Sequence, residues 1–222
     1  MAERKKAVIH KSPAGTAQYP RLTKPDTKFK PEGEYKVTLV LPGAEAQPLI
    51  ELIDKAMGES LVKAKMENPT KAKTIKVATD KPYKAVTDDE GNETGDVKFN
   101  FKMAAKITSK KTGESWEQKP DLFDAKGKVL VNPKVGGGST VKVAFELYLF
   151  YTPLVGAGVS LRLRAVQVLD LVEYNSRSAS GYGFEEEEGY EGTEQDTKSD
   201  IEVETKAPDA DVKADEDDEV PF

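Results

Sequence analysis

Four segments of this chain alternate apolar and polar residues with a period of two, the pattern of a strand with one buried face. They are residues 35–41 (YKVTLVL), 97–103 (VKFNFKM), 141–150 (VKVAFELYLF) and 159–169 (VSLRLRAVQVL). Successive side chains of a strand point to opposite faces, so the polar residues must lie on the face opposite the buried one. The last segment thus predicts Leu161, Leu163 and Ala165 facing inward, with Arg162 and Arg164 facing outward. The body of the chain is predicted to be mainly β.

One segment follows a helical spacing instead. Leu49, Ile53, Met57, Leu61 and Ala64 recur at intervals of three and four residues, which predicts an amphipathic helix of about 18 residues inserted between strands, bounded by the prolines at 48 and 69. Residues 71–82 and 87–96 are rich in Lys, Asp, Gly and Asn, and are expected to form surface loops or a hairpin. Short strands, one helix and a glycine-marked corner at 136–139 favour an OB-fold-like barrel, with a sandwich as the alternative.

The C-terminal segment carries most of the negative charge. Residues 185–222 hold 17 Asp and Glu against three Lys, a net charge of −14, so the whole-chain value of −6 leaves residues 1–184 at +8. A segment whose like charges repel one another and that has little apolar surface cannot form a core. We therefore expect one folded domain, 1–184, and a disordered acidic tail, 185–222.

The tail ends in five acids followed by an apolar tip, which is costly to leave in water. We expect this tip to bind a protein partner, and the acidic tail to cover a polyanion-binding surface of the basic body when no polyanion is present. The alternative is a tail that only solubilises the domain. The residues of the tip are Asp215, Glu216, Asp217, Asp218, Glu219, Val220, Pro221 and Phe222.

Composition argues against catalysis. The chain has no cysteine and one histidine, His10, so it lacks a familiar zinc set, and Asp88 to Glu90 lie in an expected turn. The glycines at 136–139 precede a strand, whereas a phosphate-binding loop needs a following Lys-Ser/Thr and a helix. The start has no apolar core of a secretory signal, and no apolar run is long enough to span a membrane. We expect a soluble, cytoplasmic binding protein that is not an enzyme and needs no cofactor.

Aromatic and basic residues are interleaved in the strand segments, as a single-stranded nucleic acid requires for stacking bases and neutralising phosphates. Tyr148, Phe150 and Tyr151 cluster where one strand enters its loop, and Trp116 lies in a basic loop or at a strand start. The alternative is that Tyr148 and Phe150 pack beneath the helix and that the basic side chains are only solvated. The basic residues that are expected to face outward are Lys98, Lys102, Arg162 and Arg164.

Residues 135–174 (VGGGSTVKVAFELYLFYTPLVGAGVSLRLRAVQVLDLVEY) resemble the final barrel strands of the replication-type single-stranded DNA-binding proteins of T7-like bacteriophages. LTKPD at 22–26, GEYKVTLVLP at 33–42 and FNFKMAAKITSKKTGE at 99–114 follow in the family's order. The resemblance implies an OB-fold that binds single-stranded DNA without sequence preference and promotes annealing. It also implies an acidic tail that binds replication proteins.

The same resemblance implies particular roles. Phe150 would be the base-stacking aromatic, with Tyr151 replacing a basic residue, and Lys102 with Lys110 or Lys111 would form the cationic strand and its following loop. Glu32 stands where the family has an arginine, so Lys28, Lys30 or Lys36 would supply that charge instead. The ending DDEVPF is closer to the tip of bacterial single-stranded DNA-binding proteins, which implies docking into host proteins.

Two functions remain open. The first is a protein of DNA replication, recombination and repair that coats single-stranded DNA, while its tail competes with DNA and recruits a polymerase, helicase-primase or nuclease. The second is a β-rich adaptor that binds only proteins; a metal-free nuclease is a distant third. The DNA-binding function requires the outward basic residues to form one groove beside Tyr148 or Phe150. A monomer and a homodimer with exchanged tails both satisfy the charge pattern.

Overall fold

The computed structural model describes residues 8–28, 30–109 and 112–173. The predicted tail and its tip therefore lie outside the described residues, as do Lys110 and Lys111. The elements are β1 (His10–Lys11), β2 (Gly15–Asp26), β3 (Glu34–Pro42), α1 (Gly43–Glu67), a 3-10 turn (Pro69–Lys71), β4 (Tyr83–Thr87), β5 (Glu93–Ala104), β6 (Lys106–Thr108), β7 (Ser115–Glu117), β8 (Asp121–Phe123), β9 (Thr140–Thr152) and β10 (Gly156–Asp170).

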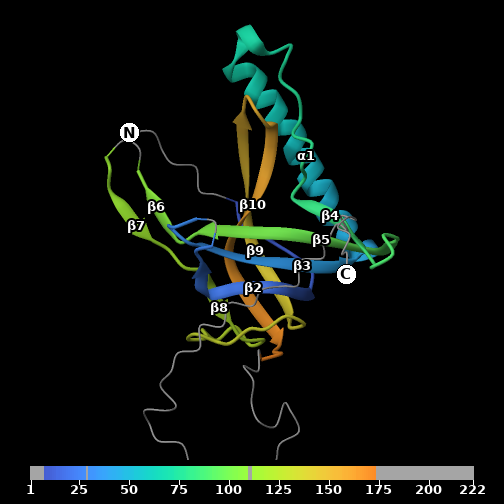
Figure 1. Cartoon of the computed structure of the whole chain (residues 1–222), viewed down its shortest axis with the longest axis vertical. Coiled ribbons are helices and arrows are strands. Elements are labelled where there is room, and N and C mark those ends of the chain that lie inside the picture. Colours follow the sequence, from blue (N-terminus) through green and yellow to red (C-terminus); the bar gives the residue numbers. More distant parts are fainter. Residues whose placement is uncertain (1–7, 29, 110–111, 174–222) are drawn as a thin grey trace, which may run out of the picture. The chain divides into compact units, whose positions relative to one another are not determined.

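Five long strands close on themselves. Their order is β9-β2-β3-β5-β10, and β10 returns to pair with β9. Within this circuit the β5–β10 pair is parallel and the other pairs are antiparallel. This five-stranded arrangement is that of an OB-fold, so the predicted barrel is confirmed and the sandwich alternative is not (Figure 1).

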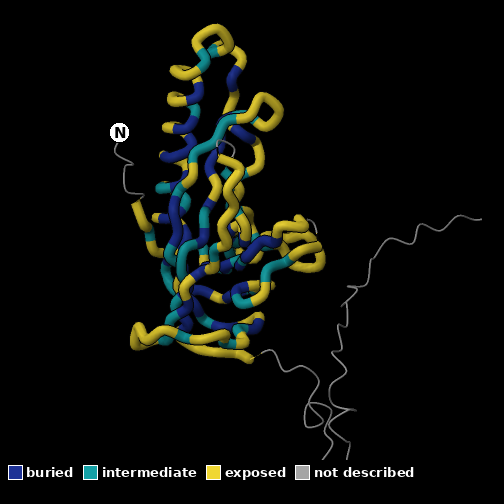
Figure 2. The backbone as a smooth tube through the Cα atoms, turned by 90° about the vertical axis from the view of Figure 1, so that its left-hand side faces the viewer, coloured by how far each residue is buried: buried dark blue, intermediate teal, exposed yellow. Residues whose placement is uncertain are grey.

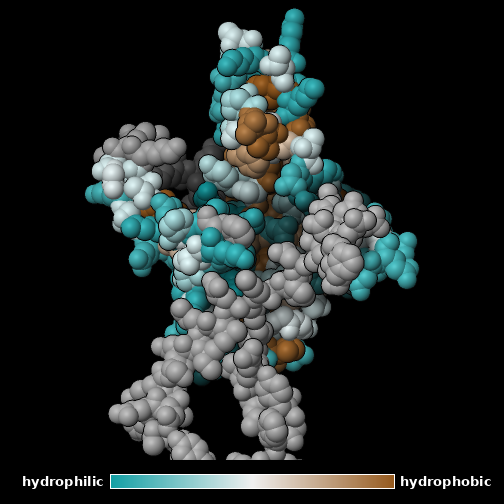
Figure 3. All heavy atoms as spheres, in the orientation of Figure 1, coloured by the Kyte–Doolittle hydropathy of each residue, from teal (hydrophilic) through white to brown (hydrophobic). Residues whose placement is uncertain are grey.

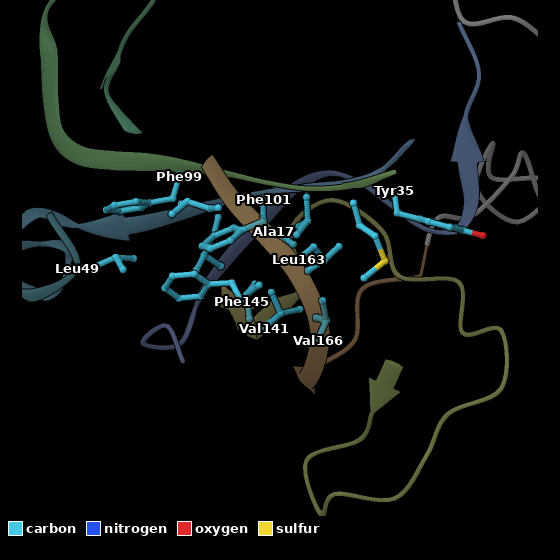
Figure 4. Packing of buried hydrophobic residues seen from close by; sticks show 14 of the residues in the cluster. Ala17, Tyr35, Leu49, Phe99, Phe101, Val141, Phe145, Leu163 and Val166 are labelled. Carbon is cyan, nitrogen blue, oxygen red and sulfur yellow. The ribbon is translucent and has the colours of Figure 1, made fainter. Parts of the chain in front are cut away.

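The core fills the barrel with the residues that the period-two pattern assigned to its interior. On β3 the inward residues Val37, Leu39 and Leu41 are at most 1% exposed. Phe101 of β5 and Phe145 of β9 meet across the interior with ring centroids 5.1 Å apart (Figure 4). The strands are buried where they cross the barrel and the loops are exposed (Figure 2). Burial of these large side chains is the main force that closes the barrel.

The alternation predicted for β10 fails after Leu163. Leu163 pairs with Phe145, but Ala165 pairs with Ala144, so Arg164 is an extra residue on β10. One extra residue exchanges the two faces of a strand from that point on. Ala165 is consequently only half-buried, while Val166 and Val168 take the inward positions. The prediction that Ala165 faces inward is therefore wrong.

The inserted helix α1 is longer than predicted. It has 25 residues and begins at Gly43, so Pro48 lies inside it rather than at its start. Proline removes one helical hydrogen bond there, and the burial of Ala46 and Leu49 on either side offsets that loss. Ile53, Met57 and Ala64 are buried as predicted, and the helix lies mainly against β9 and β10 (Figure 1). No helix in the described part of the chain is long and apolar enough to cross a membrane.

The predicted hairpin at 87–96 is confirmed, since β4 and β5 pair across a turn. The Asp88 carboxylate accepts the backbone N–H groups of Glu90 and Asn92, which fixes this turn and lowers the pKa of Asp88. Among the described residues, no group of three or more His, Asp or Glu is placed to hold a metal ion. The region 71–82 is a loop for most of its length, and Val77 within it forms a single parallel bridge with Ala157 of β10.

Candidate nucleic-acid interface

Four basic residues form one row across the outer face of the barrel. Arg162 of β10 is paired with Lys102 of β5, Lys102 with Lys36 of β3, and Lys36 with Arg21 of β2. Residues paired across strands share a face, and neighbouring strands lie about 4.8 Å apart. The side chains of Arg21, Lys36, Lys102 and Arg162, here called the cationic row, therefore run across four strands at close intervals. Such a surface suits a polyanion.

Two more lysines extend this face. Lys98 lies on β5, four residues before Lys102, and so points to the same side. Lys84 of β4 is paired with Lys98, and its ammonium forms a 2.9 Å ion pair with Asp80. The outward lysines of the barrel thus continue beyond the row toward β4.

An aromatic pair flanks the row at β9. The guanidinium carbon of Arg162 lies 4.4 Å from the ring centroid of Tyr148, and Tyr148 is 48% exposed. Phe150 lies two residues further along the same face of β9 and is half-buried. Its cross-strand partner is Gly158, where a Cβ atom would come within 2.7 Å of the Phe150 ring. The absence of a side chain at Gly158 therefore lets the Phe150 ring lie over β10.

Tyr151 faces the other way. It packs with Leu61 against a small cluster made by Ala64, Ile75 and Ala157, on the side of the hairpin that α1 covers. Tyr148 and Phe150 alternate with Leu147, Leu149 and Tyr151, so they lie on the face opposite the helix. Of the three clustered aromatics, the structure brings Tyr148 and Phe150 to the cationic row and leaves Tyr151 in packing.

The helix holds this hairpin in place through Ser60. The Ser60 hydroxyl is buried, 3.0 Å from the carbonyl oxygen of Phe150 and 2.9 Å from that of Gly158. These carbonyls belong to one cross-strand pair, so a single side chain of α1 fixes the backbone beneath the Phe150 ring. The aromatic end of the interface is therefore positioned by a rigid element.

Carboxylates pair with two basic residues of this face, Lys36 and Arg164. The Lys36 ammonium lies 2.5 Å from Asp26 Oδ2, and this contact, followed by the backbone N–H of Lys28, lowers the pKa of Asp26. Arg164 forms a 2.8 Å ion pair with Glu146, which is buried. Among the described residues, Lys102 and Arg162 form no ion pair with a carboxylate. Within the described residues, Lys36 is thus the one member of the row that is paired with a carboxylate, and Arg21, Lys102 and Arg162 are left to an external anion.

The other predicted residues are distributed as follows. Trp116 of β7 pairs with Ile107 of β6 in a separate two-stranded sheet and is 50% exposed. Lys30 forms an ion pair with Glu34, as Lys36 does with Asp26, so both of these candidates for the family's missing arginine charge have a carboxylate partner. Arg21 and Lys84 were missed by sequence reasoning. Arg21 lies where the alternation of its strand is broken, so no period-two pattern marked it as outward.

The free end of the β9–β10 hairpin is apolar. Leu154 is 96% exposed and Val155 is 47% exposed, immediately beyond the strand that carries Tyr148 and Phe150. In the space-filling view, hydrophobic side chains gather toward this end of the hairpin and the neighbouring part of α1 (Figure 3). The face with the aromatics therefore continues into exposed apolar surface.

A five-stranded OB barrel with a cationic row and aromatic rings on one outer face belongs to the class of oligonucleotide-binding barrels. Residues 14–171 match the family model described as single-stranded DNA-binding protein, bacteriophage T7. The chain belongs to this family.

Individual relatives agree with that assignment. The chain is 32% identical over 196 residues to the single-stranded DNA-binding protein of Escherichia phage T7, covering 82% of this chain and 84% of the relative. It is 31% identical over 198 residues to the protein of the same description in Enterobacteria phage T3, covering 83% and 85%. The crystal structure of gp2.5, a single-stranded DNA-binding protein of bacteriophage T7, superposes with a TM-score of 0.64 at 30% identity, covering 84% of this chain and all of that one.

A more distant structure shares the fold. The single-stranded DNA-binding protein of bacteriophage Enc34, solved in complex with single-stranded DNA, superposes with a TM-score of 0.54 at 19% identity. The match covers 74% of this chain and 88% of that one. The resemblance inferred from the sequence is thus confirmed by sequence and by fold.

Proposed function

We propose that this protein coats single-stranded DNA without sequence preference and serves DNA replication, recombination, repair and annealing in the cytoplasm of a phage-infected cell. The observation that carries the proposal is the common face of the cationic row, Tyr148 and Phe150. Membership of a family of single-stranded DNA-binding proteins supports it, as does the structure of similar fold that was solved with single-stranded DNA.

In this proposal the phosphates lie along the cationic row and bases stack on the aromatic rings. Stacking uses the π-face that every base has, and phosphate contacts carry no sequence information, so the binding is sequence-tolerant. Arg21, Lys102 and Arg162 contribute most of the electrostatic attraction of the row, because within the described residues none of them forms an ion pair with a carboxylate, whereas Lys36 does. The interface needs no catalytic group, and we expect none.

The acidic tail is proposed to compete with DNA and to recruit partners. Its net charge of −14 is opposite to the +8 of residues 1–184, so the tail and DNA would neutralise the same lysine and arginine side chains. When DNA displaces the tail, the tip ending in Phe222 becomes available to replication proteins such as a polymerase, helicase-primase or nuclease. Exchange of tails between two copies would give a homodimer by the same attraction.

The test is a fluorescence-anisotropy titration of labelled oligo-dT with the full chain and with a form ending at Phe184, at about 50 and 200 mM salt. We expect salt-sensitive binding with a log–log slope near −0.7 per phosphate contacted, and tighter binding without the tail. Lys102→Ala should weaken binding and reduce the slope. If neither form binds, the function passes to the protein-binding adaptor. If the tailless form binds no tighter, the tail does not compete.

A further inference from the structure

Tyr19 has a strained backbone. Its φ is +48°, in the left-handed region that a bulky residue rarely adopts, and the other described non-glycine residue with positive φ is Asn132, whose side chain tolerates it. The Tyr19 side chain is 80% exposed, so no core packing compensates the strain. Glycine or asparagine would fit this backbone at lower cost. The exposed ring therefore requires an explanation other than stability.

The strain belongs to a β-bulge. Gln18 pairs with Thr38 and Arg21 with Lys36, so Tyr19 and Pro20 of β2 together oppose one residue of β3. The extra residue exchanges the faces of β2: Ala17 is inward before it and Leu22 after it. Without the bulge, Arg21 would be the inward residue. The bulge thus places Arg21 in the cationic row and leaves the exposed Tyr19 two residues before it on β2.

The position of Tyr19 along the row mirrors that of Tyr148 and Phe150. Tyr148 adjoins the row at its Arg162 end, on β9, whereas Tyr19 adjoins it at its Arg21 end, on β2. Three strand spacings, about 14 Å along the surface, separate β10 from β2. A strand of DNA whose phosphates follow the cationic row would meet an aromatic ring at each end.

We propose that Tyr19 is a second base-stacking residue, which holds a nucleotide at the β2 end of the interface. This inference rests on the proposed function. Because stacking does not neutralise a phosphate, the contribution of Tyr19 is independent of salt, unlike that of the cationic row.

The test compares Tyr19→Gly and Tyr19→Phe in the full chain, with Met66→Ala as the control for loss of an exposed apolar side chain on α1. Oligo-dT of about 16 nucleotides, the upper site size of an OB-fold, should bind Tyr19→Gly about 5- to 140-fold more weakly, the equivalent of roughly 1–3 kcal/mol. Tyr19→Phe and Met66→Ala should bind like the unmodified protein. The salt slope of Tyr19→Gly should stay unchanged, and its melting temperature should not fall, because glycine relieves the strain.

Oligonucleotide length gives a second readout. Oligo-dT of about 4 nucleotides, the lower site size, should occupy one end of the row and lose less affinity in Tyr19→Gly than the longer strand does. Unchanged binding of the long strand by Tyr19→Gly, while Lys102→Ala weakens it, would overturn the role of Tyr19 and leave the proposed function standing. Equal losses in Tyr19→Gly and Tyr19→Phe would also overturn it, because the hydroxyl rather than the ring would then be the contact. No binding by the unmodified protein would overturn the function itself.

Discussion

The guanidinium carbon of Arg162 lies 4.4 Å from the centre of the Tyr148 ring, so a charge of β10 and an aromatic platform of β9 form one unit. A guanidinium over a ring is held by the ring quadrupole, and its own plane can also receive a base. The unit therefore offers a phosphate contact and a stacking surface at one place.

Arg162→Ala should weaken binding of oligo-dT and reduce the log–log salt slope by about 0.7, the value of one phosphate contact. Arg162→Lys should restore the slope but not the full affinity, because an ammonium lacks the planar face that stacks. Anisotropy titrations over a range of salt measure both quantities. Equal affinities for the lysine variant and the unmodified protein would show that the stacked geometry is irrelevant.

Phe150→Ala and Tyr151→Ala should separate binding from stability. Phe150 lies on the interface face, so its loss should cost about 1–3 kcal/mol of binding free energy and little stability. Tyr151 packs toward α1, so its loss should lower the free energy of unfolding by about 1–3 kcal/mol and leave binding by the folded protein nearly intact. Thermal unfolding and anisotropy on both variants make the comparison. A reversed pattern would place the stacking face on the other side of the hairpin.

Glu146→Gln should tighten DNA binding. The glutamate forms a 2.8 Å ion pair with Arg164, and its neutral counterpart would free that guanidinium for a phosphate while keeping a similar size. We expect higher affinity and a steeper salt slope by about 0.7. The matched control is Asp54→Asn, which removes a carboxylate paired with Lys81 instead. Unchanged affinity in Glu146→Gln would mean that Arg164 does not reach the DNA.

Asp26 should contribute stability that depends on pH. Its pKa is lowered from 3.8, first by the Lys36 ammonium and then by the backbone N–H of Lys28. A group whose pKa is lower in the folded state stabilises the fold above its unfolded pKa, near 3.9, and loses that contribution as pH falls through the folded value. Melting temperatures from about pH 6 to pH 2 should therefore fall less in Asp26→Asn than in the unmodified protein. Parallel curves would show that the pair adds no stability.

Ser60→Ala should loosen the hairpin. The hydroxyl approaches the carbonyls of Phe150 and Gly158 at 3.0 and 2.9 Å, and its loss should reduce the free energy of unfolding by about 1 kcal/mol. Amide hydrogen exchange should rise around Phe150 more than in β3. Ser60→Thr keeps the hydroxyl and tests whether the hydrogen bond, rather than the volume, matters. An unchanged exchange rate at the hairpin would contradict the supporting role of Ser60.

Sequence periodicity predicted the barrel wherever a strand kept its register. The inward residues of β3 (Val37 to Leu41) and of β5 (Phe99 to Met103) follow the predicted alternation, because nothing interrupts the pairing of these two strands. It failed at Arg164, where an extra residue enters β10, since a bulge leaves no mark in a period-two count. It made no prediction for β2, where Tyr19 lies in the other bulge. The start of α1 was misplaced because Pro48 reads as a helix boundary, although tertiary burial tolerates it.

The candidate site could be predicted by residue type but not by arrangement. The alternation identified Lys98, Lys102 and Arg162 as outward residues, yet which strands are neighbours depends on the parallel β5–β10 pair, whose members lie far apart in sequence. Tyr148 could be proposed for the interface from the alternation of its strand, whereas Arg21 could not, because the bulge before it breaks the alternation of β2. The cross-strand row exists only in the folded register.

The closed circuit of strands also determines when the interface can exist. β2 and β5 complete the barrel only by pairing with β9 and β10, which are separated from them by dozens of residues and are made last. Such long-range pairing delays folding until the distant strands are available. We therefore expect a ribosome-bound chain to stay without a barrel until residues 156–170 have emerged from the exit tunnel, so that DNA capture begins only after synthesis of the body is complete.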